Sequence, residues 1–382
     1  MKYLLANPAK FHSFEVGREL IKNNQLNKII CGYPWFKLKH EGINENKIIS
    51  LSLITILKKI IKKKKIRDIL NIYQFKKIDL TARKFLDNTN VFIGLSTCGL
   101  QTGIEAKKRG IVYICERSSS HIQYQNEILK REYQSLNLYY QPIPKEIIER
   151  EIHEYNEADF ILVPSNFVKN SFTETLKKKV KVLNFGVNTD NFFKDYSIIK
   201  SKKYFDILFI GQISLRKGLH YLIDAFEKFN HPNKRLHIIG SHTYDKEFFI
   251  KKLKNSKIKV YGHVNHLKLN KIINMCHVFV LPSIEEGFAT VILQVLSAGC
   301  PVIVSENTGA KEFVGNNKCG FVVPIRDSKA ITEKLEVLSE DITISENFQT
   351  NALNKMKKQT WENYVLQLNK LVSQYKNGIF FK

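Results

Sequence analysis

The chain has 382 residues, which is long for one hydrophobic core and suits two domains, since single cores stop growing near roughly 250 to 300 residues. A composition of 43% hydrophobic and 25% charged residues argues against a disordered or fibrous protein. The net charge of +24 indicates a phosphate-bearing partner, which could be a nucleic acid, an anionic membrane surface or a nucleotide.

The cysteines and the apolar runs indicate the compartment. The six cysteines lie far apart and none forms a Cys-x-x-Cys pair, which argues against a zinc site and a disulfide framework. The first apolar stretch is too short for a signal peptide, and the longest, residues 48–57, is about half of the ~20 residues that cross a bilayer. We expect a cytoplasmic protein, with peripheral attachment to the inner face of the membrane left open.

Short apolar runs rich in Val, Ile and Phe recur along the chain, and an amphipathic helical stretch follows each of them. This alternation predicts two doubly wound α/β domains, each with a parallel sheet of six strands. The predicted strands are 2–6, 28–31, 91–94, 112–115, 160–163 and 180–184, then 205–210, 235–239, 258–261, 278–281, 301–304 and 320–323. A polar stretch at 188–203 is the expected junction, and one final helix is expected over about 345–375.

A strongly basic stretch lies in the first half. Seven of the ten residues from 58 to 67 are Lys or Arg, and the apolar run 48–57 precedes them. The pattern predicts a basic amphipathic helix within 48–70 that lies on an anionic membrane surface. A solvated helix in a Lys-rich chain is the alternative. Nucleic-acid binding ranks third, because no nucleic-acid-binding motif accompanies the charge, and no nucleic acid is expected as a partner.

Two cations follow the first strand of the second half. Arg216 and Lys217 lie in a short loop between the strand 205–210 and the next helix, at the carboxyl edge where ligands of such sheets bind. Arg offers two parallel donors to phosphate oxygens and Lys a point charge. The alternative is an ordinary solvated turn.

Two carboxylates follow the strand 278–281. Glu285 and Glu286 end its loop, just before a helix expected to begin at Thr290. A helix N-terminus after a parallel strand presents unpaired N–H groups to an anion, so a phosphate would bind there. The alternative is that the two carboxylates only stabilise the helix N-terminus.

Together these stretches resemble the C-terminal half of the retaining glycosyltransferases of family 4, the group-1 glycosyltransferases. The shared motifs are Lys217-Gly218, LIDAF at 222–226, Glu286-Gly287-Phe288, AGCPVI at 298–303, Gly309 and Glu312. The resemblance runs from about Arg109 to Trp361. It implies the GT-B fold, with two facing Rossmann-like domains and a cleft between them. Residues 1–190 would form the acceptor-side domain, 191–355 the nucleotide-sugar domain, and 356–382 a helix packing back toward the first domain.

The resemblance implies transfer of a hexosyl-type sugar from a nucleoside diphosphate to an acceptor hydroxyl, with retained configuration, in glycan or lipopolysaccharide-type biosynthesis. Glu286 would contact the donor sugar, and Gln294 stands where relatives have the Glu that binds the ribose. Arg216 and Lys217 would bind the diphosphate, so neither a metal nor a cofactor is expected. The remaining donor-binding candidates are Gly211, Gln212, Val264, Gly287, Phe288, Ala289 and Thr290.

The acceptor side is predicted in the first domain, where polar residues follow the strand 112–115. The acceptor would be a glycan, a lipid-linked molecule or a small molecule. His121 is a candidate to orient or deprotonate its hydroxyl, and a histidine that only caps the next helix is the alternative. The other acceptor-side candidates are Lys10, His12, Glu116, Arg117 and Ser120. A sugar-nucleotide epimerase or phosphorylase on the same fold is the rival enzyme, and a basic nucleic-acid-binding protein is the rival of another class.

Overall fold

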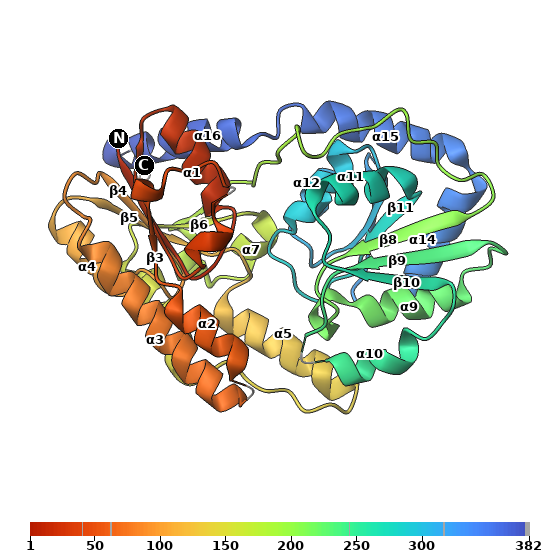
Figure 1. Ribbon diagram of the computed structural model, residues 1–382, viewed down its shortest axis with the longest axis horizontal. Helices are drawn as coiled ribbons and strands as arrows, with labels where there is room; N and C mark the ends of the chain where they lie inside the picture. The colour runs from red at the N-terminus through yellow and green to blue at the C-terminus, as the bar shows by residue number, and fades with distance from the viewer. Residues whose placement is uncertain (40, 62, 244, 316–317, 379–382) are drawn as a thin grey trace. The chain divides into compact units, whose positions relative to one another are not determined.

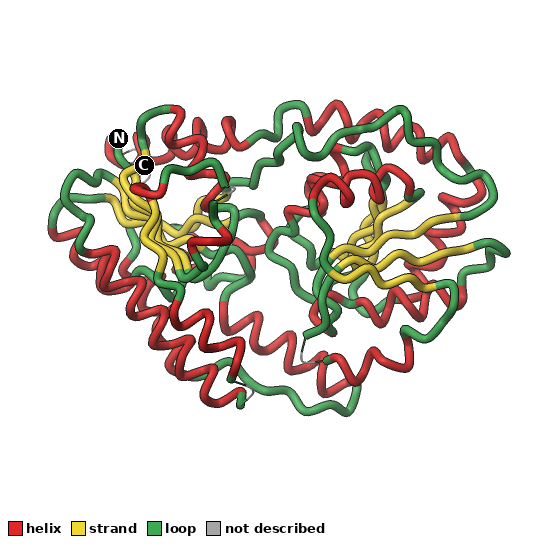
Figure 2. Tube along the Cα trace, viewed as in Figure 1, coloured by secondary structure: helices red, strands yellow, loops and turns green. Residues whose placement is uncertain are grey.

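A computed structural model describes residues 1–39, 41–61, 63–243, 245–315 and 318–378. The chain divides into two compact units. Unit 1 comprises Met1–Tyr124, Pro142–Asn184 and the segment from Trp361 onward, and unit 2 comprises Gln125–Gln141 and Phe185–Thr360. Figure 2 shows a set of strands in each unit, with helices beside it. Each unit is therefore a Rossmann-like α/β domain, as the alternation of strands and helices predicts.

Unit 1 contains a seven-stranded parallel sheet in the order β3-β2-β1-β4-β5-β6-β7, of which Figure 1 labels β3, β4, β5 and β6. The strands are β1 (Tyr3–Asn7), β2 (Leu26–Cys31), β3 (Ile48–Ser50), β4 (Val91–Leu95), β5 (Val112–Glu116), β6 (Phe160–Val163) and β7 (Val180–Val182). The helices are α1 (Ser13–Lys22), α2 (Leu53–Ile60), α3 (Lys64–Arg83), α4 (Leu100–Lys108), α6 (Lys145–Glu157), α7 (Asn166–Asn170), α8 (Glu174–Lys177) and α16 (Trp361–Lys376). Helix α5 (Ile122–Ser135) begins in unit 1 and continues into unit 2.

Unit 2 contains a six-stranded parallel sheet in the order β10-β9-β8-β11-β12-β13. The strands are β8 (Phe205–Ile210), β9 (Lys234–Ile239), β10 (Ile258–Gly262), β11 (Val278–Leu281), β12 (Val302–Ser305) and β13 (Gly320–Val323). The helices are α9 (Leu219–Lys228), α10 (Lys246–Lys252), α11 (His266–Met275), α12 (Thr290–Ser297), α13 (Lys311–Val314), α14 (Ser328–Glu340) and α15 (Ile342–Met356).

The central strands form because their apolar runs can be buried on both faces of a sheet. Every residue of β1, β5, β6 and β11 is buried, which is the pattern of parallel strands with helices on both sides. Edge strands differ, since β10 exposes Lys259 and Val260. Burial therefore explains why the long Val, Ile and Phe runs predict these strands well.

Each sheet has one point where the strand order reverses. In unit 1 it lies between β1 and β4, and in unit 2 between β8 and β11. The loops that leave these neighbouring strands turn in opposite directions, which opens a crevice at the carboxyl edge where ligands of such sheets bind. The functional residues are therefore to be sought in these two pairs of loops.

The structure corrects the prediction for residues 48–70. Ile48–Ser50 forms strand β3, which pairs with β2, so the apolar run does not belong to one amphipathic helix. The basic stretch is divided between α2 and α3, because Ile61 has an extended backbone with φ −80° and ψ 114°. Lys62 lies outside the described residues. No helix within the described part of the chain is long and apolar enough to span a bilayer.

The predicted final helix is also two helices, α15 and α16. Residues 357–360 separate them, and this break is anchored within unit 2, since Thr360 pairs with Val187 and Gln359 Nε2 donates to the Phe185 carbonyl at 2.6 Å. Helix α16 then packs in unit 1, where Tyr3 donates its hydroxyl to Asn369 at 2.7 Å. Unit 2 also includes Gln125–Gln141, which lies within the first domain as predicted from sequence.

Candidate active site

The loops after β8 and β11 pack against each other in unit 2. Gly218 has φ 65°, and a Cβ there would lie 1.9 Å from the Pro282 carbonyl oxygen, so this position requires glycine. The Ile284 N–H donates to the Arg216 carbonyl at 2.9 Å. These backbone contacts fix the two loops, and the side chains that they carry, at the reversal point of the sheet.

Two ion pairs connect the loops. Arg216 donates Nε to Glu285 Oε2 at 2.8 Å, and Lys217 Nζ pairs with Glu286 Oε2. Glu285 is fully buried and also accepts a hydrogen bond from Gln125 Nε2 at 2.9 Å. Burial acts to lower the pKa of Arg216, but the Glu285 and Glu286 carboxylates outweigh it and raise that pKa above its ordinary value. The structure thus brings together the predicted residues Arg216, Lys217 and Glu286.

Helix α12 begins beside this cluster. Its N-cap residue Ala289 provides no side-chain hydrogen bond, so the N-terminus is not capped by its own N-cap residue. Backbone contacts fix Glu286, whose N–H donates to the Asn307 carbonyl at 3.0 Å and whose carbonyl accepts from Gly309 at 2.9 Å. Two cations and the N-terminus of α12 at one sheet edge form an arrangement that can bind an anion such as a diphosphate.

The other predicted donor residues lie at the same carboxyl edge of the sheet. Their side chains differ in solvent exposure. Gln212 is exposed and Gln294 is partly buried. A Cβ on Gly211 would lie 3.9 Å from Lys217 Cδ, which places Gly211 under the Lys217 side chain. Phe288 is buried, with its ring centroid 5.4 Å from that of Phe185. Val264 lies in the loop that leaves β10, Gly287 and Ala289 lie in the loop that leaves β11, and Thr290 is the first residue of α12.

A small pocket lies at the reversal point of unit 1. It is lined by Asn7, His12, Ser13 and Glu116, among others. His12 Nε2 and Glu116 Oε1 are 2.6 Å apart, and the His12 ring stacks on Trp361 with centroids 6.1 Å apart. The Asn7 side-chain amide is buried and forms no hydrogen bond within the described chain, and neither does Ser13 Oγ. Buried polar groups normally have partners, and this cavity of about 10 Å³ has room for one water molecule or the tip of one polar group.

The other acceptor-side candidates are held in other contacts. Arg117 forms a buried ion pair with Glu151 at 2.9 Å and donates Nε to the Ser120 carbonyl at 3.0 Å. Lys10 pairs with Glu41. Of the five acceptor-side residues expected in this domain with His121, His12 and Glu116 line the pocket, and Lys10, Arg117 and Ser120 do not.

His121 is placed differently from the prediction that it acts on an acceptor. Its Nδ1 accepts a hydrogen bond from the Gln123 N–H at 3.3 Å, and its ring packs against Tyr155 and Phe172 with centroids 5.2 and 5.0 Å away. Burial and the nearby charge of Arg117 lower the pKa of His121 to about 4, so it is a weak base at neutral pH. The geometry favours the alternative role, which is capping the following helix.

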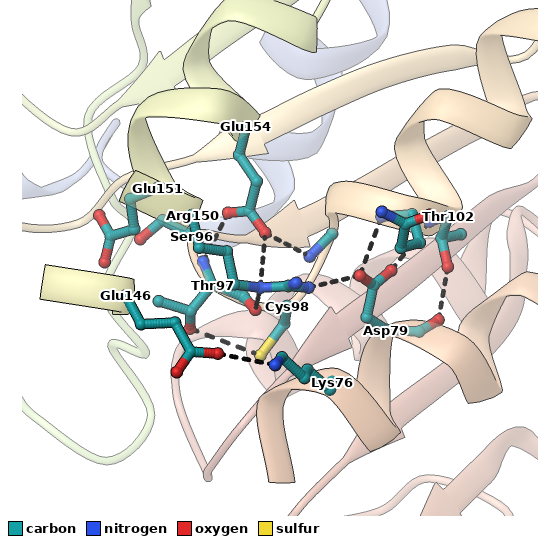
Figure 3. Close-up of polar contacts among 12 residues, drawn as sticks. Lys76, Asp79, Ser96, Thr97, Cys98, Thr102, Glu146, Arg150, Glu151 and Glu154 are labelled. Atoms are coloured by element: carbon teal, nitrogen blue, oxygen red, sulfur yellow. Dashed lines mark hydrogen bonds and ion pairs between the residues drawn. The ribbon is translucent and has the colours of Figure 1, made fainter. Parts of the chain in front are cut away.

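A buried network holds the loop after β4 in unit 1 (Figure 3). Glu154 accepts backbone hydrogen bonds from Thr97 at 2.5 Å and Gly99 at 3.0 Å, and Arg150 donates Nε to the Thr97 carbonyl at 2.7 Å. Asp79 pairs with Arg150 and accepts from the first turn of α4. Burial raises the pKa of Glu154 to about 8. The network stabilises the left-handed conformation of Thr97, at φ 83°, and so fixes this edge of the sheet.

Sequence reasoning missed three polar residues of these two sites. Asn7 ends β1 and Ser13 begins α1, so the rule that ligands bind at carboxyl edges could have indicated both. Gln125 carried no such signal, because its contact with Glu285 joins positions 160 residues apart. Within the described residues, no group of three or more His, Cys, Asp or Glu side chains is arranged to hold a metal ion.

Residues 190–355 match the family described as glycosyl transferases group 1. This segment contains both loops of the unit 2 site, and the match supports the superfamily that the motifs predict. Assignment to family 4 and retention of configuration stay predictions.

Solved structures show the GT-B fold over the whole chain. Sucrose-phosphate synthase from Thermosynechococcus elongatus has a TM-score of 0.72 at 14% identity and covers 99% of this chain and 100% of that chain. HepE from Anabaena, in complex with UDP and glucose, has a TM-score of 0.72 at 15% identity, covering 98% and 100%.

Curated relatives match part of the chain. The capsular polysaccharide biosynthesis glycosyltransferase CapM of Staphylococcus aureus is 29% identical over 217 residues, or 52% of this chain and 57% of that protein. The N-acetylgalactosamine-N,N'-diacetylbacillosaminyl-diphospho-undecaprenol 4-alpha-N-acetylgalactosaminyltransferase of Campylobacter jejuni is 25% identical over 211 residues, or 53% and 57%. The chain spans about half the length of these relatives.

Proposed function

We propose that the protein is a glycosyltransferase of glycan biosynthesis, which transfers a hexosyl-type sugar from a nucleoside diphosphate to an acceptor hydroxyl with retained configuration. The observation that carries the proposal is the convergence of Arg216, Lys217 and Glu286 at the reversal point of the unit 2 sheet, inside the segment that matches the family. The relatives named above, which make capsular polysaccharide or act on a lipid diphosphate, support the glycan class of acceptor. The epimerase, phosphorylase and nucleic-acid-binding alternatives gain no support from these relatives.

The donor diphosphate would bind between the two cations and the N-terminus of α12. Lys217 would leave Glu286 for a phosphate oxygen, and the released Glu286 carboxylate would accept hydrogen bonds from sugar hydroxyls. Arg216 would remain bound to Glu285 through Nε, and its terminal nitrogens would exchange their present contacts, including that with Glu286, for diphosphate oxygens. Fixed positive groups stabilise the charge that grows on the departing diphosphate, so the site needs no metal for this step.

The donor base and ribose would lie toward Val264 and Gln294. A glutamine carbonyl can accept one ribose hydrogen bond, although without the charge of a carboxylate. The HepE structures contain UDP or UDP-glucose, which makes uridine diphosphate the first nucleotide to test. The acceptor, a glycan, lipid-linked or small molecule, would present one hydroxyl group at the small unit 1 pocket beside His12 and Glu116.

The reaction would take place in the cytoplasm. All six cysteines are buried free thiols, which suits a reducing compartment. Burial raises the pKa of the thiols, including that of Cys31 to about 11, so they stay protonated and unreactive at neutral pH.

Two substitutions test the donor site, because Lys217 and Glu286 would contact different parts of the donor. Lys217→Ala should weaken binding of free nucleoside diphosphate and lower turnover together. Glu286→Gln should spare nucleoside diphosphate affinity and lower turnover by roughly ten- to a hundredfold, since one charge-assisted hydrogen bond contributes about 1.5 to 3 kcal/mol.

The measurement is calorimetric binding of UDP, GDP and ADP beside steady-state transfer from their sugar conjugates. Lys329→Ala is a matched control, because that lysine is 87% exposed and distant in sequence from the loops. A fully active Glu286→Gln variant, or a Lys217→Ala variant that binds the diphosphate as tightly as wild type, would show that the donor site lies elsewhere.

A further inference from the structure

A cavity in unit 2 lies away from the proposed donor site. Its volume is about 460 Å³, within the ~300–1,000 Å³ range of small-ligand pockets. It is lined by one face of α15, by Ser297 and by residues 189–196, which we call the cavity loop, and all of these belong to unit 2. Ser297 is the last residue of α12 and Thr290 the first. The cavity therefore lies roughly 10 Å along this helix from the end that the diphosphate would approach.

Helix α15 presents polar side chains to the cavity. Gln349 and Asn354 line it, and Figure 1 shows this helix near α12, which it contacts. The turn after α12 allows a close approach, since Gly299 has φ 67° and a Cβ there would lie 2.7 Å from Gln349 Cγ. Asn354 Oδ1 accepts a hydrogen bond from Lys357 Nζ at 3.1 Å. An amide and an amine thus lie together at the cavity wall.

The cavity loop contributes two exposed aromatic rings. Phe193 is 47% exposed and Tyr196 is 79% exposed, whereas the neighbouring Phe192 is buried. Two buried side chains of α11 fix the loop backbone. The Phe193 N–H donates to Asn270 Oδ1 at 3.2 Å, and its carbonyl accepts from Asn274 Nδ2 at 3.0 Å. The exposure of the Phe193 ring is therefore part of the folded structure.

Ser297 brings an unsatisfied hydroxyl group to the cavity. The residue is 6% exposed, and its Oγ is buried without a hydrogen bond in the described part of the chain. Buried polar atoms of folded proteins almost always have a partner. A hydroxyl group of a ligand in the cavity would supply it.

The charge of the cavity is positive. Lys194 and Lys357 line it, and its lining includes no acidic side chain. Asp195 Oδ1 accepts instead from the N–H and Oγ of Ser197, at 3.0 and 2.6 Å. Burial and the nearby charge of Lys200 lower the pKa of Lys194. A negatively charged ligand group would stabilise the ammonium form of this lysine.

We propose that the cavity binds an acidic saccharide, at a site separate from that of the donor. The apolar C–H faces of the sugar rings would pack on Phe193 and Tyr196, and sugar hydroxyls would pair with Asn354 and Ser297. The acidic group would bind Lys194. Single-stranded nucleic acid also uses aromatic and basic side chains, but along a groove several nucleotides long, so it fits this cavity less well. The inference does not rest on the proposed transferase activity.

Calorimetric binding of acidic tetrasaccharides tests the proposal on the full chain. The probes are tetragalacturonate and a hyaluronan tetrasaccharide, measured at moderate salt beside the neutral maltotetraose. At least one acidic probe should bind, and more tightly than maltotetraose, because only an acidic sugar can pair with the lysines. Absence of binding by both acidic probes, or equal affinity for maltotetraose, would overturn the proposal.

One pair of variants tests the aromatic rings. Phe193→Ala with Tyr196→Ala should weaken binding of the acidic probe by about tenfold or more, because the rings supply much of the contact area. The matched control is Phe36→Ala with Tyr139→Ala, which removes rings that are 58 and 84% exposed outside the cavity. The control should bind as wild type does. Equal losses in the two pairs would show that the saccharide binds elsewhere.

A second pair of variants tests the charge. Lys194→Gln with Lys357→Gln should weaken binding of the acidic probe several-fold. The control is Lys145→Gln with Lys329→Gln, at positions 89 and 87% exposed. Both pairs lower the net charge equally, so a loss in the first pair alone supports a local contact. Equal losses would mean that the probe responds only to the overall charge, which would contradict the proposal.

Ser297→Ala separates a ligand contact from a structural role. Removing an unpartnered hydroxyl group should leave the thermal stability of the free protein unchanged or raise it, while probe binding weakens several-fold. A less stable variant that binds the probe as tightly as wild type would make the hydroxyl structural and count against the proposal. So would octathymidylate that binds more tightly than both acidic probes and loses this affinity in the variant without the cavity rings.

Each variant is also tested for thermal stabilisation by UDP. A cavity variant that loses saccharide binding but keeps the wild-type response is folded, and its result supports a saccharide site separate from the donor site. Absence of any nucleotide response in wild type would count against the donor site and leave the saccharide result interpretable.

Discussion

The reversal points of the two sheets use charged residues in different ways. In unit 2, Arg216 and Lys217 lie on the loop after β8, and their carboxylate partners lie on the neighbouring loop after β11. The two cationic side chains are 27 and 14% exposed. In unit 1, Arg117 follows β5 at the corresponding sheet edge, but its side chain is 9% exposed and that of its partner Glu151 is 4%. The first pair of cations can reach a ligand, whereas Arg117 supports the fold.

This difference shows that a charge at a carboxyl edge is not by itself a binding group. The two sites differ in the element that carries the carboxylate partner of the cation. Glu286 shares an edge with Lys217 and can exchange it for a ligand, while Glu151 comes from helix α6, whose buried face holds Arg117 from within the core. The same residue types therefore face a candidate site in one unit and build the scaffold in the other.

The largest expected effect, on the free energy of unfolding, comes from removing the carboxylate of each ion pair. Glu151→Ala should destabilise unit 1 by about 3 to 5 kcal/mol, because it leaves the Arg117 charge buried and unpaired. Glu285→Ala should cost less stability, since Arg216 is partly exposed, but should weaken nucleoside diphosphate binding about tenfold by releasing Arg216 from its orientation.

Urea unfolding and calorimetry on both variants measure these effects. The Gln variants serve as controls, because each keeps a hydrogen-bond acceptor without the charge. If folded Glu151→Ala protein loses diphosphate affinity as strongly as Glu285→Ala, the distinction between scaffold and site is wrong.

A smaller effect on the transfer rate distinguishes His12 from His121 in unit 1. His12→Ala should lower transfer by roughly a hundredfold, as loss of a group positioned for proton transfer often does. His121→Ala should change the rate of folded protein only a few-fold, because His121 caps a helix and stays neutral. Steady-state transfer at saturating donor measures both. Lys10→Ala, which removes an ion pair with Glu41, should resemble wild type. The opposite ranking of the histidines would restore His121 as the acceptor-side residue.

The sequence predicts the strands better than the helices around the basic stretch. The strands at 160–163, 205–210, 278–281 and 320–323 match in both bounds, because continuous β-branched and aromatic runs can only be buried between helices. Strand β3 was missed since its three residues lie in an apolar run that continues into α2. Its pairing with β2 is a tertiary contact with no local signal.

The donor-side and acceptor-side sites also differ in how far the sequence predicts them. Arg216, Lys217 and Glu286 could be predicted because local motifs at two adjacent strand ends contain them, and strand adjacency brings them together. The contact of His12 with Glu116 joins positions 104 residues apart, and the burial that lowers the pKa of His121 depends on Tyr155 and Phe172. Those features arise only when the unit has folded.

The smallest expected effect concerns the pH dependence of stability, and it compares one histidine from each unit. Burial lowers the pKa of both His121 and His277 to about 4. The two histidines bind protons near pH 6.5 in the unfolded chain but not in the folded state. The contribution of each neutral ring to the free energy of unfolding is therefore fully present above about pH 6.5 and is lost as the pH falls toward 4. At about pH 5.5, each should lower the free energy of unfolding of its unit by roughly 1 kcal/mol relative to neutral pH.

Tryptophan fluorescence can assign this loss to one unit, since Trp35 and Trp361, the two tryptophans of the chain, both lie in unit 1. His121→Asn keeps a short capping acceptor without a titrating ring, so it should reduce the difference in unfolding free energy between about pH 7 and pH 5.5 by roughly 1 kcal/mol. His277→Asn, in unit 2, should leave the fluorescence-detected difference unchanged. Because both variants remove the same kind of group, a reduction by His121→Asn alone would locate the proton uptake in unit 1. An unchanged difference in the His121→Asn variant would mean that His121 titrates near its ordinary pKa and is accessible to protons, and it would then regain a place among the candidate bases.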